Sequence, residues 1–182
     1  GFAGAGAAAA TTLAAPAIAQ DSRKITWRCT SSFPKSLDTI YGAADVFSKL
    51  VSSMSGGKFQ ITVATPGEIV PAFGVLDAVQ QGTVEAAHTA SVFFFGKDPT
   101  FALDGQIPFG MNSRQMTAWM KDGEGTQLLR EFYRGYDVVN FPCGNTGTQM
   151  GGWYRKEIKS VKDFEGLKMR IGGFGGRVLA KL

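Results

Sequence analysis

The chain has 182 residues, of which 44% are hydrophobic and 19% are charged, so it can build a sizeable core and is not typical of a disordered protein. Its 19 basic and 15 acidic residues give a net charge of +4. These charges are spread along the chain, whereas nucleic-acid-binding proteins usually carry a basic stripe. Composition and charge therefore exclude a disordered chain and argue against a nucleic-acid-binding protein.

The first twenty residues are uncharged and rich in alanine, and they are too weakly apolar to form a membrane-spanning helix. The sequence Ala17-Ile18-Ala19 has the small-x-small pattern that signal peptidase cleaves. We therefore interpret residues 1–19 as part of an export signal that begins upstream. The alternative is an Ala/Gly linker or a disordered tail. With the export signal removed, a mature chain would begin at Gln20 in the periplasm.

Hydrophobic periodicity predicts alternating strands and helices in the first half of the chain. Strand patterns alternate between two faces, and helix patterns repeat every three or four residues. The expected elements are a strand at 24–29, a helix at 37–54, a strand at 59–63, a helix at 72–81 and a strand at 84–89. This β-α-β-α-β order predicts a parallel sheet with helices on both faces.

After residue 90 the pattern is looser. Asn112 is placed to cap a helix over 113–121. The other expectations are a helix at 126–134, strands at 137–141, 149–154 and 167–171, one helical turn after Ser160, a glycine loop at 172–176 and a helix that begins at Arg177. Because the sequence stops one turn into that helix, we expect a truncated chain.

Several chemistries have little support. His88 is the only histidine and has no acid or nucleophile beside it in the sequence, so a structural role is favoured over a catalytic base. The glycine loop at 172–176 invites a nucleotide-binding interpretation. However, Val178 occupies the place of the third glycine of a dinucleotide fingerprint, and Gly176-Arg177-Val178 does not match the end of a P-loop. We favour a tight turn in which the backbone approaches a neighbour closely.

The two cysteines, Cys29 and Cys143, lie more than a hundred residues apart. In an exported protein they could form one long-range disulfide or remain as two buried free thiols, and we favour the thiols. The sequence has no CxxC motif, no HExxH motif and no Cys/His cluster, so a structural zinc site has no support.

The segment from residue 143 to 153 concentrates groups that could hold a ligand. Asn145 and Gln149 supply donors and acceptors, and Trp153 supplies an apolar wall. Arg170 follows near the end of an expected strand, where open α/β sheets bind ligands, and its guanidinium can grip a carboxylate. The alternative makes Arg170 part of a solvated basic set with the neighbouring lysines. The residues alone leave both interpretations open.

Six motifs occur in the order found in one protein family. They are GGKF from Gly56, PGEIVPAF from Pro66, HTAS from His88, GKDP from Gly96, GNTG with QMGGW from Gly144, and GLKMR from Gly166. The chain resembles the extracytoplasmic solute receptors of TRAP (tripartite ATP-independent periplasmic) transporters, near the subgroup labelled for 2-oxo acids and mannitol/chloroaromatic compounds. The resemblance extends over residues 24–182.

This resemblance implies an α/β fold: a two-lobed periplasmic binding protein of the type II-like class, truncated within the second lobe. Residues 20–140 would form lobe I, and residues 141–182 would begin lobe II. The receptor would bind a small carboxylate (a 2-oxo acid or hydroxy acid) and deliver it to the membrane permease subunits of a TRAP transporter. It would be no enzyme, would bind no nucleic acid, and would form a homodimer through the missing C-terminal region.

The resemblance also implies roles for individual residues. Arg170 would pair with the substrate carboxylate, and Asn145 and Gln149 would lie in the cleft. Gln149 would also help to hold a sodium or calcium ion that bridges the ligand, and no other cofactor is expected. Phe93 and Phe94 are candidate ligand contacts, because they lie in the aromatic run where the family usually has a tyrosine. Because phenylalanine lacks the tyrosine hydroxyl, one possible hydrogen bond to the ligand is lost, and the identity of the substrate stays open.

Three other functions stay as alternatives: a receptor of an ATP-driven importer, a sensor module, and a fragment of a Rossmann-type oxidoreductase. The first would differ in the genes of its membrane partners. The second would carry membrane-spanning or signalling segments further along the chain. The third is disfavoured by the missing glycine at Val178.

Overall fold

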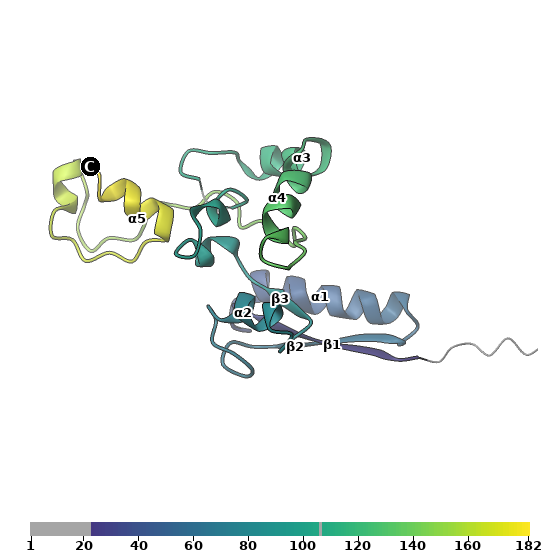
Figure 1. Cartoon of the computed structure of the whole chain (residues 1–182). Coiled ribbons are helices and arrows are strands. Elements are labelled where there is room, and N and C mark those ends of the chain that lie inside the picture. The colour runs from purple at the N-terminus through teal and green to yellow at the C-terminus, as the bar shows by residue number, and fades with distance from the viewer. Residues whose placement is uncertain (1–22, 106) are drawn as a thin grey trace, which may run out of the picture.

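The computed structural model describes residues 23–105 and 107–182, so the expected export signal lies outside the described residues. The first part of the chain forms a three-stranded parallel sheet in the order β2-β1-β3 (Figure 1). Its strands are β1 (Ile25–Ser31), β2 (Phe59–Ala64) and β3 (Ala86–His88). β1 is central: it pairs with β2 over six residue pairs, Ile25 to Thr30 with Phe59 to Ala64, and with β3 over three, Cys29 to Ser31 with Ala86 to His88.

Helix α1 (Asp38–Met54) connects the first two strands and packs against β2. It buries Tyr41 and Ala44, and the Tyr41 hydroxyl donates a hydrogen bond to the Val63 carbonyl of β2 at 3.3 Å. Gly56 and Gly57 have φ values of 58° and 78° and turn the chain back into β2. Helix α2 (Val75–Gln80) then leads to β3. The expected β-α-β-α-β order is confirmed.

Four short elements form a second layer beside the sheet. They are the 3-10 turns η1 (Ser91–Phe94) and η2 (Pro99–Ala102) and the helices α3 (Ser113–Asp122) and α4 (Gly125–Arg134). Asn112 caps α3 as expected, in a reciprocal capping box with Gln115. Phe101 is only 1% exposed, and its ring meets the rings of Phe94, Phe132, Tyr133 and Tyr136 at centroid distances of 4.8–5.6 Å.

Residues 150–182, hereafter the C-terminal segment, extend away from the sheet and the α3–α4 layer (Figure 1). This segment contains the 3-10 turn η3 (Val161–Phe164) and helix α5 (Gly173–Leu179). Two expectations fail here. The stretches 137–141, 149–154 and 167–171 form no strands, since no partner among the described residues pairs with them. The glycines expected to form a loop at 172–176 instead begin α5, with Gly172 as its N-cap.

Both cysteines are free thiols, but they differ in burial. Cys29 lies in the central strand and is buried, as expected. Cys143 is exposed, because it lies in an extended stretch in which every residue from 141 to 151 is exposed. The expectation of two buried thiols was therefore wrong for Cys143.

Beside the short strand β3, a side chain takes over part of the pairing of β1. The Arg28 backbone N–H donates to the Glu85 carboxylate at 2.6 Å, and the Arg28 guanidinium forms an ion pair with the same carboxylate at 3.2 Å. These hydrogen bonds hold the pKa of Glu85 below its usual value. Over the described ranges, no helix is long and apolar enough to cross a membrane.

Candidate functional site: a cationic groove and an aromatic edge

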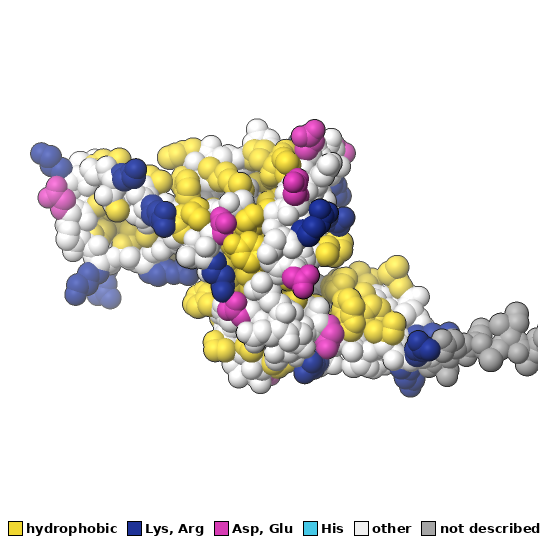
Figure 2. All heavy atoms as spheres, viewed as in Figure 1, with side chains coloured by type: hydrophobic (Ala, Val, Ile, Leu, Met, Phe, Trp, Pro, Cys, Tyr) yellow, Lys and Arg dark blue, Asp and Glu magenta, His cyan; other side chains and the backbone are white. Residues whose placement is uncertain are grey.

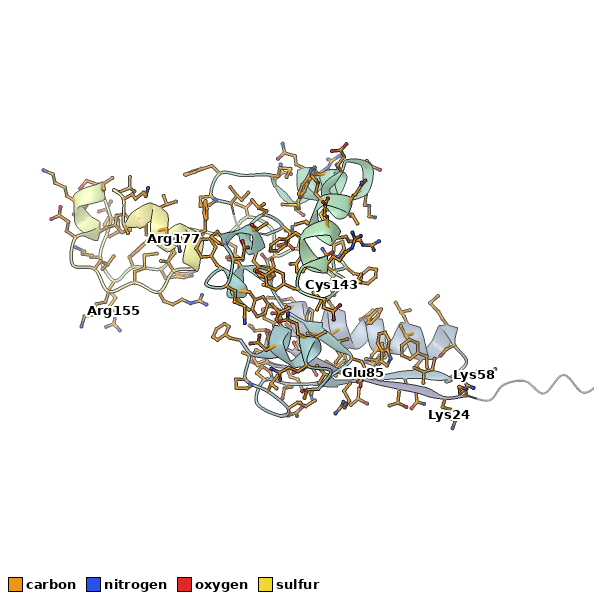
Figure 3. All side chains as sticks on the ribbon, in the orientation of Figure 1. Lys24, Lys58, Glu85, Cys143, Arg155 and Arg177 are labelled. Carbon is orange, nitrogen blue, oxygen red and sulfur yellow. The ribbon has the colours of Figure 1, made fainter. Side chains whose placement is uncertain are left out.

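Two stretches of the C-terminal segment enclose a groove of about 530 Å³. Residues 152–156 form one wall and residues 167–170 form the other. The lining residues are Gly152, Trp153, Tyr154, Arg155, Lys156, Leu167, Lys168, Met169 and Arg170. Four of these side chains are cationic. Figure 2 shows Lys and Arg side chains around this segment, and Figure 3 labels Arg155 on its outer side.

The turn between the two walls is fixed by local hydrogen bonds. The Asp163 carboxylate accepts from the backbone N–H groups of Lys159 and Ser160, at 2.9 and 2.8 Å, and from the Ser160 hydroxyl at 3.1 Å. These contacts hold the pKa of Asp163 below its usual value. Gly166, with φ of 70°, then reverses the chain. η3 therefore returns the chain so that residues 167–170 lie opposite residues 152–156.

Tyr154 packs between the two walls. Its ring meets Phe164 edge-on at a centroid distance of 5.9 Å, and its hydroxyl lies 3.7 Å from the Met169 sulfur. A Cβ atom at Gly152 would lie 3.0 Å from the Tyr154 hydroxyl and from the Met169 terminal methyl, so glycine permits this close approach. The groove thus has an apolar floor below a cationic rim.

Arg170 is exposed on this rim. Within the described ranges the ion pairs of the chain involve other residues, and no carboxylate is paired with Arg170. Trp153 lines the same groove and is 91% exposed. A guanidinium beside an open indole face can hold a planar carboxylate by charge and by parallel hydrogen bonds.

The polar residues expected in the cleft lie on a tight local turn. The Asn145 side-chain oxygen accepts a hydrogen bond from the Gly147 N–H at 2.7 Å, and Gly147 has φ of 73°. The Gln149 side-chain N–H donates to the Thr146 hydroxyl at 2.8 Å. This bond uses the amide nitrogen of Gln149 and leaves its amide oxygen, an atom type that hard cations bind.

The aromatic run after Ser91 separates into different environments. Phe93 meets Phe33 and Phe73 at centroid distances of 5.9 and 5.2 Å, and this set of three rings is hereafter called the aromatic edge. It lies where β1 and β3 end, because Phe33 follows β1 closely and Phe93 follows β3. Phe94 instead packs against Phe101 and is only 4% exposed. The expectation that Phe94 contacts a ligand therefore fails, since this ring belongs to the core.

Hydrogen bonds join the strand ends beneath the aromatic edge. The Ser31 hydroxyl lies 3.1 Å from Nδ1 of His88, and both residues are buried. The Ser32 hydroxyl donates to the Ala72 carbonyl at 2.6 Å and lies 2.7 Å from the Thr89 hydroxyl. Burial lowers the pKa of His88, so its imidazole is neutral at pH 7. This arrangement fits the structural role expected for His88.

The structure thus brings together some of the expected site residues and separates others. Arg170 and Trp153 line one groove. Asn145 and Gln149 form a turn of their own, and Phe93 belongs to the aromatic edge. Sequence reasoning missed Phe33 and Phe73. The position of Phe33 just beyond a parallel strand was a usable signal, since ligands bind at the carboxyl ends of such strands.

Comparison with known proteins places the chain in a protein family. Residues 30–182 match the family model described as bacterial extracellular solute-binding protein, family 7. The chain belongs to this family. Members of the family are solute-binding proteins. A monocarboxylate 2-oxoacid-binding periplasmic protein of Nostoc sp. (strain PCC 7120 / SAG 25.82 / UTEX 2576) is 51% identical over 158 residues, which cover 87% of this chain and 43% of the relative.

Solved structures of TRAP solute-binding proteins share the fold of this family member. One of them, from Bordetella bronchiseptica RB50, is a mixed-occupancy dimer with calcium and picolinate bound in one site. It is 52% identical to this chain and has a TM-score of 0.84, and the match covers 87% of this chain and 47% of that protein. One from Pseudoalteromonas atlantica T6c with sodium and pyruvate has 40% identity and a TM-score of 0.84 over 87% and 48%. The expected α/β fold is confirmed, and the chain spans less than half the length of these relatives.

The metal ions in these relatives agree with the expected bridging cation. A third structure, from Colwellia psychrerythraea, holds calcium and pyruvate, and it has 38% identity and a TM-score of 0.84 over 87% of this chain and 48% of its own. In the described part of this chain, no three His, Cys, Asp or Glu side chains gather to hold a metal. The amide oxygen of Gln149 is of the type that sodium and calcium bind, so this residue fits as a single ligand.

Proposed function

We propose that the protein is the periplasmic receptor of a TRAP transporter, and that it binds a small 2-oxo or hydroxy carboxylate and delivers it to membrane permease subunits without catalysing a reaction. One observation carries this proposal: the Arg170 guanidinium stands unpaired with any described carboxylate on a groove that is also lined by Trp153. The 2-oxo acids named for the most similar relatives match this cationic and aromatic chemistry.

In this proposal, residues 20–140 form lobe I and residues 141–182 begin lobe II. Arg170 holds the ligand carboxylate, Asn145 and Gln149 contact its polar atoms, and Phe93 meets its tail. A sodium or calcium ion held in part by Gln149 would bridge the protein and the ligand and neutralise carboxylate charge. A homodimer through the C-terminal half is part of the proposal, since one of the relatives is a dimer.

The test is calorimetric titration of the complete gene product with pyruvate, longer 2-oxo acids, lactate and a neutral polyol, with and without sodium or calcium. In the proposed receptor the two lobes close over the ligand and bury the pair between Arg170 and the carboxylate, and removing one partner of a buried charge pair costs about 2–5 kcal/mol. Arg170→Ala should therefore weaken carboxylate binding by roughly thirty-fold to several-thousand-fold. Arg170→Lys should recover little, because an ammonium cannot form two parallel hydrogen bonds.

Arg155→Ala is the matched control, since Arg155 lines the same groove and carries the same charge. If the groove only attracts anions electrostatically, both substitutions should weaken binding equally, by less than about 1 kcal/mol. Tight polyol binding that is insensitive to Arg170→Ala would contradict the carboxylate assignment.

A further inference from the structure

Helix α5 begins directly against the η1 turn, and the contact is made by the glycine-rich stretch whose role the sequence left open. A Cβ atom at Gly173 would lie 2.7 Å from Cδ1, 3.0 Å from Cγ and 3.2 Å from Cβ of Phe95. The first distance is shorter than real Cβ contacts, and the other two are tighter than most of them. Glycine at position 173 is therefore required for the backbone of α5 to lie on the Phe95 ring.

The Phe95 ring has little room to move away. It is only 6% exposed, and its ring meets that of Phe174 edge-on at a centroid distance of 5.8 Å. The Arg177 guanidinium carbon lies 4.9 Å from the centre of the Phe95 ring, a cation–π contact (Figure 3 labels Arg177 on α5). Three residues of α5, Gly173, Phe174 and Arg177, thus hold one side chain of the η1 region.

Phe95 is linked to the aromatic edge through the backbone of one short turn. Phe93 lies within η1 and Phe95 follows η1 as its C-cap, and the Phe95 N–H donates to the Val92 carbonyl at 3.1 Å. Phe93 contacts Phe33 and Phe73, whereas Phe95 contacts α5. A single turn therefore presents one ring to the aromatic edge and another to the C-terminal segment.

On the other side of the contact, Arg170 is connected to α5 by a compact stretch. Gly173 follows Arg170 by three residues, and the Ile171 side chain folds back onto α5. Cβ atoms at Gly175 and Gly176 would lie 3.1 and 3.3 Å from Ile171 side-chain carbons. Arg170 therefore lies three residues from the Gly173–Phe95 contact, next to a side chain that packs on the same helix.

We propose that the packing of Phe95 on Gly173 sets the position of Arg170 relative to the aromatic edge, so that Phe95 and Gly173 are positioning residues for carboxylate binding. This inference rests on the function proposed above. It assigns the glycine-rich stretch the role of a pivot, meaning the contact that fixes how two parts of the chain lie relative to each other. One part carries Arg170, which holds the carboxylate, and the other carries the aromatic edge, which meets the rest of the ligand.

The decisive variant is Gly173→Ala in the complete gene product, with Gly42→Ala as the control. Both add one methyl group to a helix and favour the helix equally. Only the methyl at 173 meets another residue, because a Cβ atom at Gly42 of α1 would have nothing within 4 Å. We expect Gly173→Ala to weaken binding of pyruvate, 2-oxobutyrate and picolinate by the same factor, about ten-fold, within the range of coupling between contacting residues. Gly42→Ala should change affinity by less than about two-fold.

A double substitution separates positioning from a general loss of structure. Once Phe95→Ala has removed the ring, adding Gly173→Ala should cost little further affinity, because the clashing Cγ and Cδ1 atoms are gone. Phe95→Leu keeps an apolar side chain in the core and should also weaken all three ligands equally. Unchanged affinity in Gly173→Ala or Phe95→Leu, or losses that simply add in the double variant, would overturn the proposal.

Hydrogen–deuterium exchange gives a readout that needs no ligand. Gly173→Ala should speed exchange of the η1 amides, including Phe95, whereas Gly42→Ala should not. If the unsubstituted protein binds none of the three carboxylates but this difference in exchange is seen, the proposed function fails and the pivot stands. If exchange in η1 is the same in both variants, the pivot is wrong whatever the protein binds.

Discussion

The Tyr133 hydroxyl donates a hydrogen bond to the Asp104 carboxylate at 3.0 Å, and the other oxygen of that carboxylate accepts one from the Ser91 hydroxyl. Tyr133 lies on α4 and Ser91 begins η1, so one half-buried carboxylate joins the helical layer to the turn that carries Phe93 and Phe95. Desolvation raises the pKa of Asp104 even though both hydrogen bonds lower it. Burying part of this carboxylate costs solvation free energy, and the hydrogen bonds from Ser91 and Tyr133 offset part of that cost. This fits a role for Asp104 in fixing η1.

Asp104→Ala should lower the free energy of unfolding by about 1–3 kcal/mol, because it leaves the hydroxyl groups of the buried Tyr133 and the half-buried Ser91 without this acceptor. Urea denaturation followed by circular dichroism would measure this loss. Asp122→Ala, which removes an exposed carboxylate at the end of α3, is the control and should be close to neutral. Equal effects of the two substitutions would show that the Asp104 network adds nothing to stability.

His88 should make stability fall as the pH drops below about 6.5. Burial lowers its pKa in the folded chain, so between that lowered pKa and the ordinary value the unfolded chain binds more protons. Unfolding is therefore favoured progressively as the pH falls through this window. His88→Gln should flatten the decline in melting temperature measured from pH 8 to pH 5.

Ser31→Ala is the control for this titration. It removes the hydrogen bond at 3.1 Å but keeps the buried imidazole, so the decline below pH 6.5 should persist at a lower overall stability. A His88→Gln protein whose decline matches that of the unsubstituted protein would rule out His88 as its source.

The two cysteines should differ sharply in reactivity. Burial raises the pKa of Cys29 to about 11, so its thiol stays protonated and shielded at neutral pH. Cys143 is exposed, and although desolvation also raises its pKa, reagents can reach its sulfur. Maleimide labelling at pH 7.5 followed by mass spectrometry should modify Cys143 alone, with Cys29 labelled only after denaturation. No labelling until a reductant is added would reveal a disulfide instead.

The strands and the helix of the sheet region could be predicted closely because each has a clear hydrophobic periodicity within its own residues. Residues 24–29 and 59–63 alternate between two faces, and the 37–54 pattern repeats at helical spacing, so these elements were found to within two residues. The stretches 137–141, 149–154 and 167–171 show the limit of this reasoning. An alternating pattern predicts an extended backbone, but a strand also needs a partner, and periodicity does not specify one.

The site was predicted less completely, for two physical reasons. Three consecutive phenylalanines have no periodicity, so nothing in the sequence separates Phe93 at the aromatic edge from Phe94 in the core. The glycines from 172 to 176 have low helix propensity, which favoured a loop. Tertiary packing overrides this preference, because larger side chains would collide with Phe95 and Ile171.

The carboxylate of Glu85 beside β1 bears on how the protein avoids self-association. β3 covers only Cys29 to Ser31 of β1, so no strand of residues 23–105 or 107–182 pairs with residues 25–28 on that side. An open flank of this kind can recruit a strand from another molecule and start aggregation. Glu85 occupies the Arg28 N–H that such a strand would use, and it places a charge at the point of docking. The ion pair thus opposes edge-to-edge pairing at this part of the sheet.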